Sequence, residues 1–159
     1  MPETILHFWF QELTRAQWWK VDPALDELIR NRFTAVHVAA NAGELYAWRT
    51  QAQGRLAEII VLDQFSRNVH RGTPQAFASD PMALVLAQEA VALGVDAALS
   101  GPERAFLLMP YMHSESRLIH VEAERLFSAP GLEDNYQFAL RHKAIIDRFG
   151  RYPHRNAIL

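Results

Sequence analysis

The chain has 159 residues, half of them hydrophobic and about a fifth charged, with a formal net charge of −2. This is the length of one domain, so we expect a single domain over residues 1–159. No apolar run approaches the ~20 residues of a membrane span. The absence of cysteine excludes disulfides, thiolate metal sites and cysteine nucleophiles. The N-terminus lacks the basic start of a signal peptide, so we expect a cytoplasmic protein, and the negative charge disfavours nucleic acid as a partner.

All of the predicted elements are helices. The chain is rich in Ala, Leu, Glu, Gln and Arg, and it shows neither sustained alternation of apolar residues nor a hairpin turn signal. In chain order, we expect helices over residues 3–11, 23–42, 44–52, 55–70, 74–78, 81–93, 102–109, 115–127 and 134–149. The short connections between them predict antiparallel helical hairpins, and no regular repeat is visible.

Proline and glycine set the predicted helix ends. Asp22, Thr73 and Asp80 each precede a proline and are expected to cap a helix N-terminus. Four glycines follow helical stretches and are expected to end them: Gly43, Gly72, Gly94 and Gly150. Pro110 is expected to end the helix over 102–109.

Three stretches depart from the pattern of an ordinary helical core. In the first, Asp63 and Arg67 lie four residues apart at the edge of a stripe formed by Ile59, Leu62 and Phe65. A helix that only packs into a core carries Leu or Ala at such positions. The pair predicts either a polar site or a surface salt bridge.

The second stretch is Met109–Glu115, where His113 is expected just outside a helix N-terminus with Glu115 in its first turn. Unpaired backbone N–H groups at that end favour an anion. The alternative is a capping device in which Ser114 accepts a hydrogen bond from one of these groups.

The third stretch is the C-terminal segment from Arg148 to Asn156, which carries three arginines and His154 between aromatic residues. Such a segment predicts an anion pocket, because arginine offers a rigid fork for carboxylate or phosphate. It equally fits a structural clasp in which the aromatics are buried and the guanidinium groups are paired.

Standard catalytic and cofactor signatures are absent. The sequence contains no nucleophile elbow, phosphate-binding loop, dinucleotide fingerprint or HExxH motif, so it predicts no metal and no cofactor and does not define an enzyme class.

The same three stretches resemble a bacterial family known as domain of unknown function 924. The matching blocks are residues 62–68 (LDQFSRN) with 71–80, 109–115 (MPYMHSE) and 148–156 (RFGRYPHRN), preceded by Phe8-Trp9-Phe10 and Trp18-Trp19. The resemblance implies an all-α, tetratricopeptide-like right-handed helical array and no established activity. Ser66 stands where the family commonly has proline. Family members continue past Asn-Ala-Ile-Leu, so we expect a further C-terminal helix of the family to be missing after residue 159.

With the resemblance, these blocks predict a polar pocket that binds a small anionic ligand. Its predicted residues are Asp63, Arg67, Asn68, His113, Glu115, Arg148, Arg151, His154 and Arg155. Asp63 and Glu115 are expected to orient the arginines, and His113 or His154 is the candidate for proton transfer. The alternative is a protein- or peptide-interaction module with exposed tryptophans, whose polar residues form a structural salt-bridge lattice.

Overall fold

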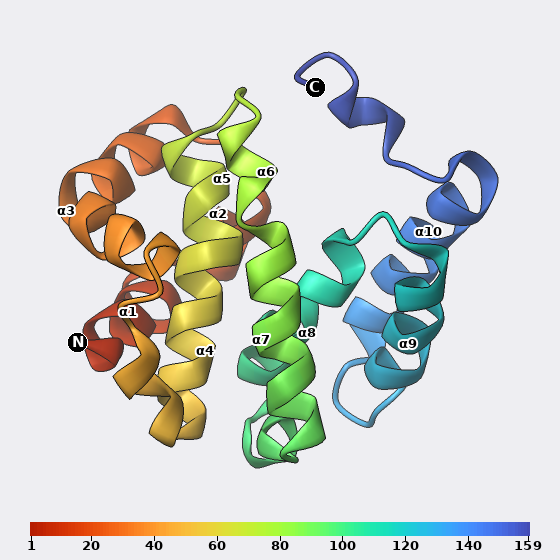
Figure 1. Ribbon diagram of the computed structural model, residues 1–159, viewed down its shortest axis with the longest axis horizontal. Helices are drawn as coiled ribbons and strands as arrows, with labels where there is room; N and C mark the ends of the chain where they lie inside the picture. Colours follow the sequence, from red (N-terminus) through yellow and green to blue (C-terminus); the bar gives the residue numbers. More distant parts are fainter. The chain divides into compact units, whose positions relative to one another are not determined.

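The computed structural model describes residues 1–159 and contains helices and turns but no strands, as predicted (Figure 1). The backbone contacts divide the chain into two compact units, residues 1–79 (unit 1) and 80–159 (unit 2). None of the helices is long and apolar enough to cross a membrane.

Unit 1 is built around an aromatic core. Its elements are α1 (Pro2–His7), η1 (Phe8–Glu12), α2 (Arg15–Trp19), α3 (Pro23–Asn41), η2 (Tyr46–Thr50), α4 (Ala52–Ile60), η3 (Val61–Phe65), α5 (Ser66–Val69) and α6 (Gln75–Ala78). The rings of Phe8, Phe33 and Phe65 lie within 6.1 Å of one another, centre to centre. This cluster joins η1, α3 and η3. The burial of its three rings stabilises the packing of these elements on one another.

Two segments of unit 1, η1 and η3, are π-helical, with a wider turn than an α-helix. The helix predicted over 55–70 is therefore continuous in space but consists of α4, η3 and α5. All five residues of η3 are buried, including Asp63 and Gln64. The wide turn places these polar side chains inside the unit, rather than at the edge of the apolar stripe.

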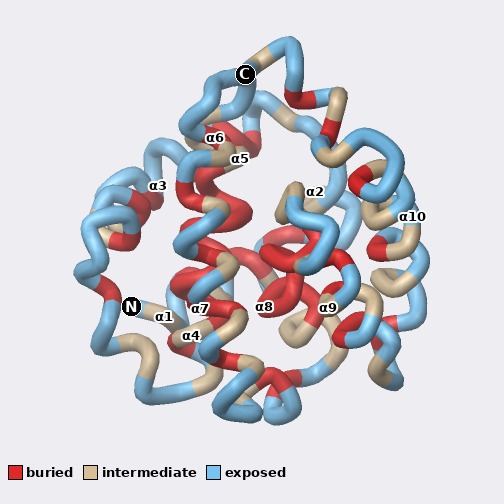
Figure 2. The backbone as a smooth tube through the Cα atoms, turned by 45° about the vertical axis from the view of Figure 1, so that its right-hand side comes forward, coloured by how far each residue is buried: buried red, intermediate tan, exposed pale blue.

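Unit 2 stacks its long helices in chain order. Its elements are α7 (Asp80–Ala92), η4 (Val95–Ala98), α8 (Gly101–His113), α9 (Arg117–Phe127), α10 (Glu133–Phe149) and η5 (Pro153–Arg155). Helix α7 packs on α8, α8 on α9, and α9 on α10. Within unit 2, α8 carries a long buried stretch (Figure 2), in which every residue from Ala105 to Met112 is buried.

Several predicted boundaries are confirmed. The carboxylate of Asp22 accepts a hydrogen bond from the Ala24 backbone N–H and caps α3. The four glycines expected to end helices all have a left-handed backbone, with φ between 70° and 82°. That conformation is strained for residues with a Cβ, which explains the glycine at each helix end.

Other boundaries were wrong. Pro110 does not end a helix: α8 runs through it to His113, because the burial of the surrounding apolar residues outweighs the lost backbone hydrogen bond. The expected helix over 44–52 is the short 3₁₀ turn η2. Ser114 does not cap the next helix, since α9 begins at Arg117 and the hydroxyl of Ser116 accepts from the Ile119 N–H. Thr73 donates to the His70 carbonyl instead of capping α6.

Candidate functional site

A cavity of about 100 Å³ lies in unit 1, beside the N-terminal aromatic residues. We call it the arginine cavity. It is lined by residues of η1, α2, η3 and α5 and by the loops that follow α2 and α5. These residues are Trp9, Gln17, Trp18, Trp19, Lys20, Val21, Gln64, Arg67, Asn68 and Arg71.

Arg67 lines the cavity, and its guanidinium is bound by Asp63, which does not line the cavity. Its Nη1 donates to the Asp63 backbone carbonyl at 2.8 Å and lies 3.5 Å from the carboxylate Oδ1. The guanidinium also lies over the ring of Phe77, 5.3 Å from its centre. Asp63 is fully buried, and its second oxygen accepts from the Gln64 amide. The two side chains pair as their spacing predicts, but the pair is internal rather than a surface salt bridge.

Arg71 also borders the cavity and is held by Asp26 of α3. Its Nε and Nη2 donate to the two carboxylate oxygens at 2.7 and 3.1 Å, and the Asn68 amide donates to the same carboxylate at 2.9 Å. Burial by itself raises the pKa of Asp26, but these hydrogen bonds outweigh it and hold the pKa below its ordinary value. Asp26 is therefore ionised at neutral pH, and its charge fixes Arg71 at the rim of the cavity.

Tryptophans form the opposite wall. Trp18 donates its indole N–H to the Trp9 carbonyl at 2.9 Å, and the two rings stack with an interplanar angle of 15°. Trp19 meets Trp18 edge-on and is 60% exposed. The backbone N–H of Thr14 donates to the Gln17 side chain at the start of α2 and so orients this short helix. The wall offers flat apolar surface next to the cations.

All of the charged residues that line the cavity are positively charged. Lys20, Arg67 and Arg71 line it, whereas no acidic residue does. The carboxylates of Asp26 and Asp63 hold the arginines but are not among the lining residues. The volume of about 100 Å³ is below the ~300–1,000 Å³ of a pocket that encloses a whole drug-sized ligand. The arginine cavity can hold one phosphate or carboxylate group, with the remainder of a ligand outside.

In unit 2 the second and third sequence blocks come together at Glu115. Its carboxylate accepts the Tyr152 backbone N–H at 2.6 Å and lies 3.8 Å from Arg155 Nη1. Arg155 also donates to the His113 carbonyl at 3.1 Å, and its guanidinium lies 4.8 Å from the centre of the Tyr152 ring. The Arg155 side chain is buried by these contacts, and they tie the C-terminal segment to the end of α8.

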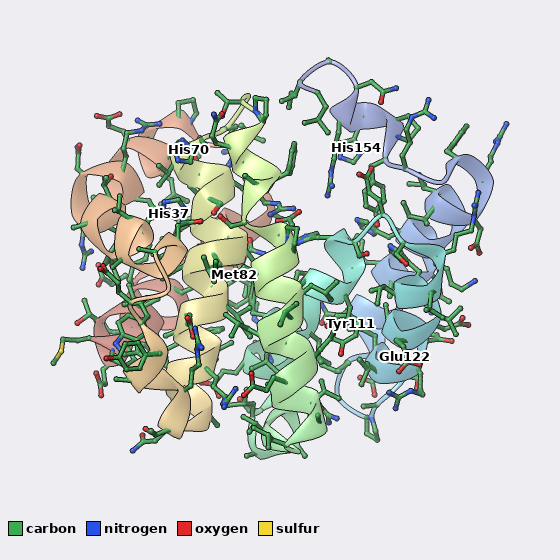
Figure 3. The ribbon with its side chains drawn as sticks, viewed as in Figure 1. His37, His70, Met82, Tyr111, Glu122 and His154 are labelled. Atoms are coloured by element: carbon green, nitrogen blue, oxygen red, sulfur yellow. The ribbon has the colours of Figure 1, made fainter.

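The remaining predicted residues of unit 2 are more exposed. Arg148 lies over the ring of its neighbour Phe149, 5.0 Å from the ring centre. Arg151 is exposed and makes no ion pair. His154 lies 5.5 Å from the Tyr152 ring, on the C-terminal segment labelled in Figure 3.

Tyr152 is itself surrounded by histidines. Besides His154, the rings of His120 and His142 lie 6.1 and 5.6 Å from its centre. His120 Nε2 donates to the Ser114 carbonyl at 2.6 Å, and its buried Nδ1 has no hydrogen-bond partner. Burial lowers the pKa of both His120 and His142, against the effect of their hydrogen bonds to backbone carbonyls. Both rings are therefore neutral at pH 7.

Sequence reasoning missed part of the arginine cavity. Lys20, Arg71 and Asp26 were not among the predicted site residues, although Arg71 belongs to the quoted 71–80 block. Asp26 was identifiable from the helical spacing of the sequence. It lies three residues before Ile29 and seven before Phe33, on the buried side of α3, where an apolar residue is expected. No group of three or more metal-ligating side chains is placed to hold a metal ion.

The chain is similar to a known protein family and to a solved structure. A family model described as bacterial protein of unknown function (DUF924) matches residues 5–159. A solved structure of a protein of unknown function from Agrobacterium tumefaciens is 36% identical, with a TM-score of 0.89 over 99% of this chain and 88% of that chain. A search of curated proteins gave no match.

Proposed function

We propose that this chain, which belongs to the bacterial family of unknown function DUF924, binds a small anionic ligand whose charged group enters the arginine cavity. The observation that carries the proposal is that the charged residues lining the cavity are all cations. Three cations line it, and the two carboxylates that hold the arginines are not part of the lining. An anion there gains charge-assisted hydrogen bonds without meeting a carboxylate.

The flat tryptophan wall supports a ligand with an apolar or planar part next to its charged group. Trp19 lines the cavity beside the cations and is 60% exposed, so a part of the ligand that extends out of the cavity would lie next to its ring. We therefore propose a phosphate- or carboxylate-bearing metabolite as the ligand class. Arg67 and Asn68 would contact its charged group, with Asp63 as a positioning residue.

The six predicted residues of unit 2 do not line the arginine cavity, and we propose them as a separate anion contact within that unit. These are His113, Glu115, Arg148, Arg151, His154 and Arg155. Arg148 is the most direct test among them, because its side chain is exposed and its contact is with the neighbouring Phe149 ring. Arg148→Ala is expected to keep the melting temperature, to weaken the anion contact of unit 2 and to leave binding in the arginine cavity unchanged.

The test is a thermal-shift titration of the full chain with inorganic phosphate, pyrophosphate and citrate, at constant ionic strength set with chloride. An anion at a hundredfold excess over its Kd adds about 2.7 kcal/mol to the free energy of unfolding, which raises Tm by roughly 5–10 °C. Lys20→Ala removes one lining cation that makes no ion pair and is expected to weaken binding about threefold to tenfold. Arg15→Ala, which removes an exposed cation of the preceding helix α2 that does not line the cavity, is the matched control.

The proposal fails if no anion shifts Tm, or if Lys20→Ala and Arg15→Ala bind the anion equally well. The second candidate function, an interaction module with a structural salt-bridge lattice, is favoured by the buried contacts of Arg155 with Glu115 and Tyr152. It predicts that Arg155→Lys lowers Tm while no anion stabilises the native chain.

A further inference from the structure

Helix α1 packs against α4 in unit 1 (Figure 1). A second and larger cavity is lined there by residues of α1, η2 and α4 and by Gln51, which lies between η2 and α4. Its volume is about 520 Å³, within the ~300–1,000 Å³ range of small-molecule sites. It shares no lining residue with the arginine cavity. We call it the Trp48 pocket, after the largest side chain that lines it.

The walls of the Trp48 pocket are fixed by close packing. A Cβ on Gly54 would lie 1.9 Å from the Trp48 carbonyl oxygen, so only glycine allows α4 to approach η2 this closely. Next to Trp48, Arg49 forms a bidentate pair with the buried Glu58 of α4, at 2.8 and 2.7 Å. Arg55 Nε donates to the Arg49 carbonyl at 2.9 Å. These contacts hold the Trp48 backbone in place without involving its ring.

Among the polar side chains that line the pocket, only the Thr50 hydroxyl is committed within the chain, because it donates to the Ala47 carbonyl at 3.5 Å. The side chains of Glu3, Gln51 and Gln53 line it and make no hydrogen bond within the chain, and neither does the indole N–H of Trp48. Gln51 precedes α4 but its side chain does not cap that helix. The pocket therefore offers two primary amides, one carboxylate and one indole N–H to a ligand.

The charge of the lining selects the ligand class. No lysine, arginine or histidine lines the pocket, and Glu3 is its one charged residue, so an anion is disfavoured. Trp48, Leu6 and Pro2 provide apolar surface for the face of a ring, and the amides and carboxylate suit groups that both donate and accept hydrogen bonds. Hydroxyl groups on a ring have that character. We propose that the Trp48 pocket binds an uncharged, polyhydroxylated ring, that is, a sugar, with its apolar face on the Trp48 indole.

The two sites of unit 1 are independent in this scheme. The arginine cavity takes a charged group, whereas the Trp48 pocket takes hydroxyl groups, and the proposal for one does not rest on the other. The amide side chains of Gln51 and Gln53 would each bridge hydroxyl groups, with Glu3 accepting from a further hydroxyl.

The test is saturation-transfer NMR on the full chain with glucose, xylose and maltose as probes, a method suited to weak binding. Transfer to the ring C–H protons of at least one sugar is expected. Gln53→Ala alters an exposed side chain of the pocket and is expected to reduce the transfer at least fivefold, as is Trp48→Leu. Gln11→Ala is the matched control, because Gln11 is exposed and does not line the pocket, and it is expected to retain the signal.

Lys20→Ala separates this proposal from the preceding one, because it is expected to weaken phosphate binding and to leave the sugar signal unchanged. No transfer to any sugar would overturn the proposal, as would equal transfer in Gln53→Ala and Gln11→Ala. Binding of tetramethylammonium in the place of sugars would also overturn it, in favour of a cation held by Glu3 and the Trp48 ring.

Discussion

Asp26 is the residue at which stability and ligand binding are expected to change in opposite directions. Its carboxylate holds Arg71 through two hydrogen bonds and lies outside the lining of the arginine cavity. In Asp26→Asn, Arg71 keeps a neutral partner but loses the neutralising charge. The free energy of unfolding is expected to fall by about 1–2 kcal/mol, a reduced figure because Arg71 is partly exposed. Phosphate affinity is expected to rise about threefold to tenfold, because the net positive charge near the cavity increases by one.

Urea denaturation and a phosphate titration on the same Asp26→Asn preparation check both parts. Asp22→Asn is a suitable control, because it removes a nearby charge at the cap of α3, outside the contacts of Arg71. A phosphate affinity that falls together with stability would show that Asp26 serves to orient Arg71, and that its charge does not oppose the ligand.

Gly54 shows how an element boundary depends on contacts that are distant in sequence. Replacing a glycine inside a helix with alanine ordinarily stabilises the helix by about 1 kcal/mol. At Gly54 the added Cβ would meet the Trp48 carbonyl oxygen at 1.9 Å, which requires α4 to move away from η2. We expect Gly54→Ala to lower the free energy of unfolding by roughly 1–3 kcal/mol, the range of overpacking in a core.

Thermal or urea denaturation of Gly54→Ala tests whether the free energy of unfolding falls. Gly101→Ala is the matched control, since a Cβ there has its closest contact at 3.4 Å, with the Gly131 carbonyl, and its backbone is not left-handed. If Gly54→Ala is as stable as the native chain, the contact between η2 and α4 is not tight in solution.

The prediction of elements from the sequence succeeded where a local signal decided the outcome. The Asp22 cap and the left-handed glycines after helices depend only on neighbouring residues, and both are confirmed. Pro110 gave a strong local signal for a helix end, yet α8 continues because the residues around it are buried. The π-helical turn η3 has no signal in the periodicity, because its register is set by the packing of Phe65 against Phe8 and Phe33.

The candidate site was predictable to the extent that it lies within sequence blocks. Within the first block, the spacing of Asp63 and Arg67 correctly indicated a pair. Between the second and third blocks, Glu115 lies 3.8 Å from Arg155, and its role in orienting a ligand-binding arginine stays a prediction. Asp26 and Lys20 approach the first block only through the fold of α2 and α3, so spacing along the chain could not identify them.

At the scale of the whole molecule, stability is expected to fall as the pH drops below neutrality. Burial lowers the pKa of His37, and the nearby His70 lowers it further. The two ring centres are 5.5 Å apart, and both residues are labelled in Figure 3. Burial likewise lowers the pKa of His120 and His142 in unit 2. Each of these histidines binds a proton more readily in the unfolded chain than in the native one.

The direction of the pH dependence follows from this difference in pKa between the native and the unfolded chain. The contribution of these histidines to stability is complete above about pH 6.5, their ordinary pKa, and is lost progressively as the pH falls toward their lower native values. Each can contribute up to about 1.4 kcal/mol per pH unit in that interval. The carboxylate of Asp26 is affected only at lower pH, because its stabilisation is lost below the ordinary aspartate pKa of about 3.9.

Urea denaturation between about pH 5 and pH 7.5 measures this slope directly, and one substitution identifies its source. In His142→Gln the slope is expected to decrease, because one group that resists protonation in the native chain has been removed. Because His142 contacts Tyr152, the contact between α10 and the C-terminal segment is expected to weaken on acidification. Stability that stays constant or rises as the pH falls would mean that these rings accept protons in the native chain without cost.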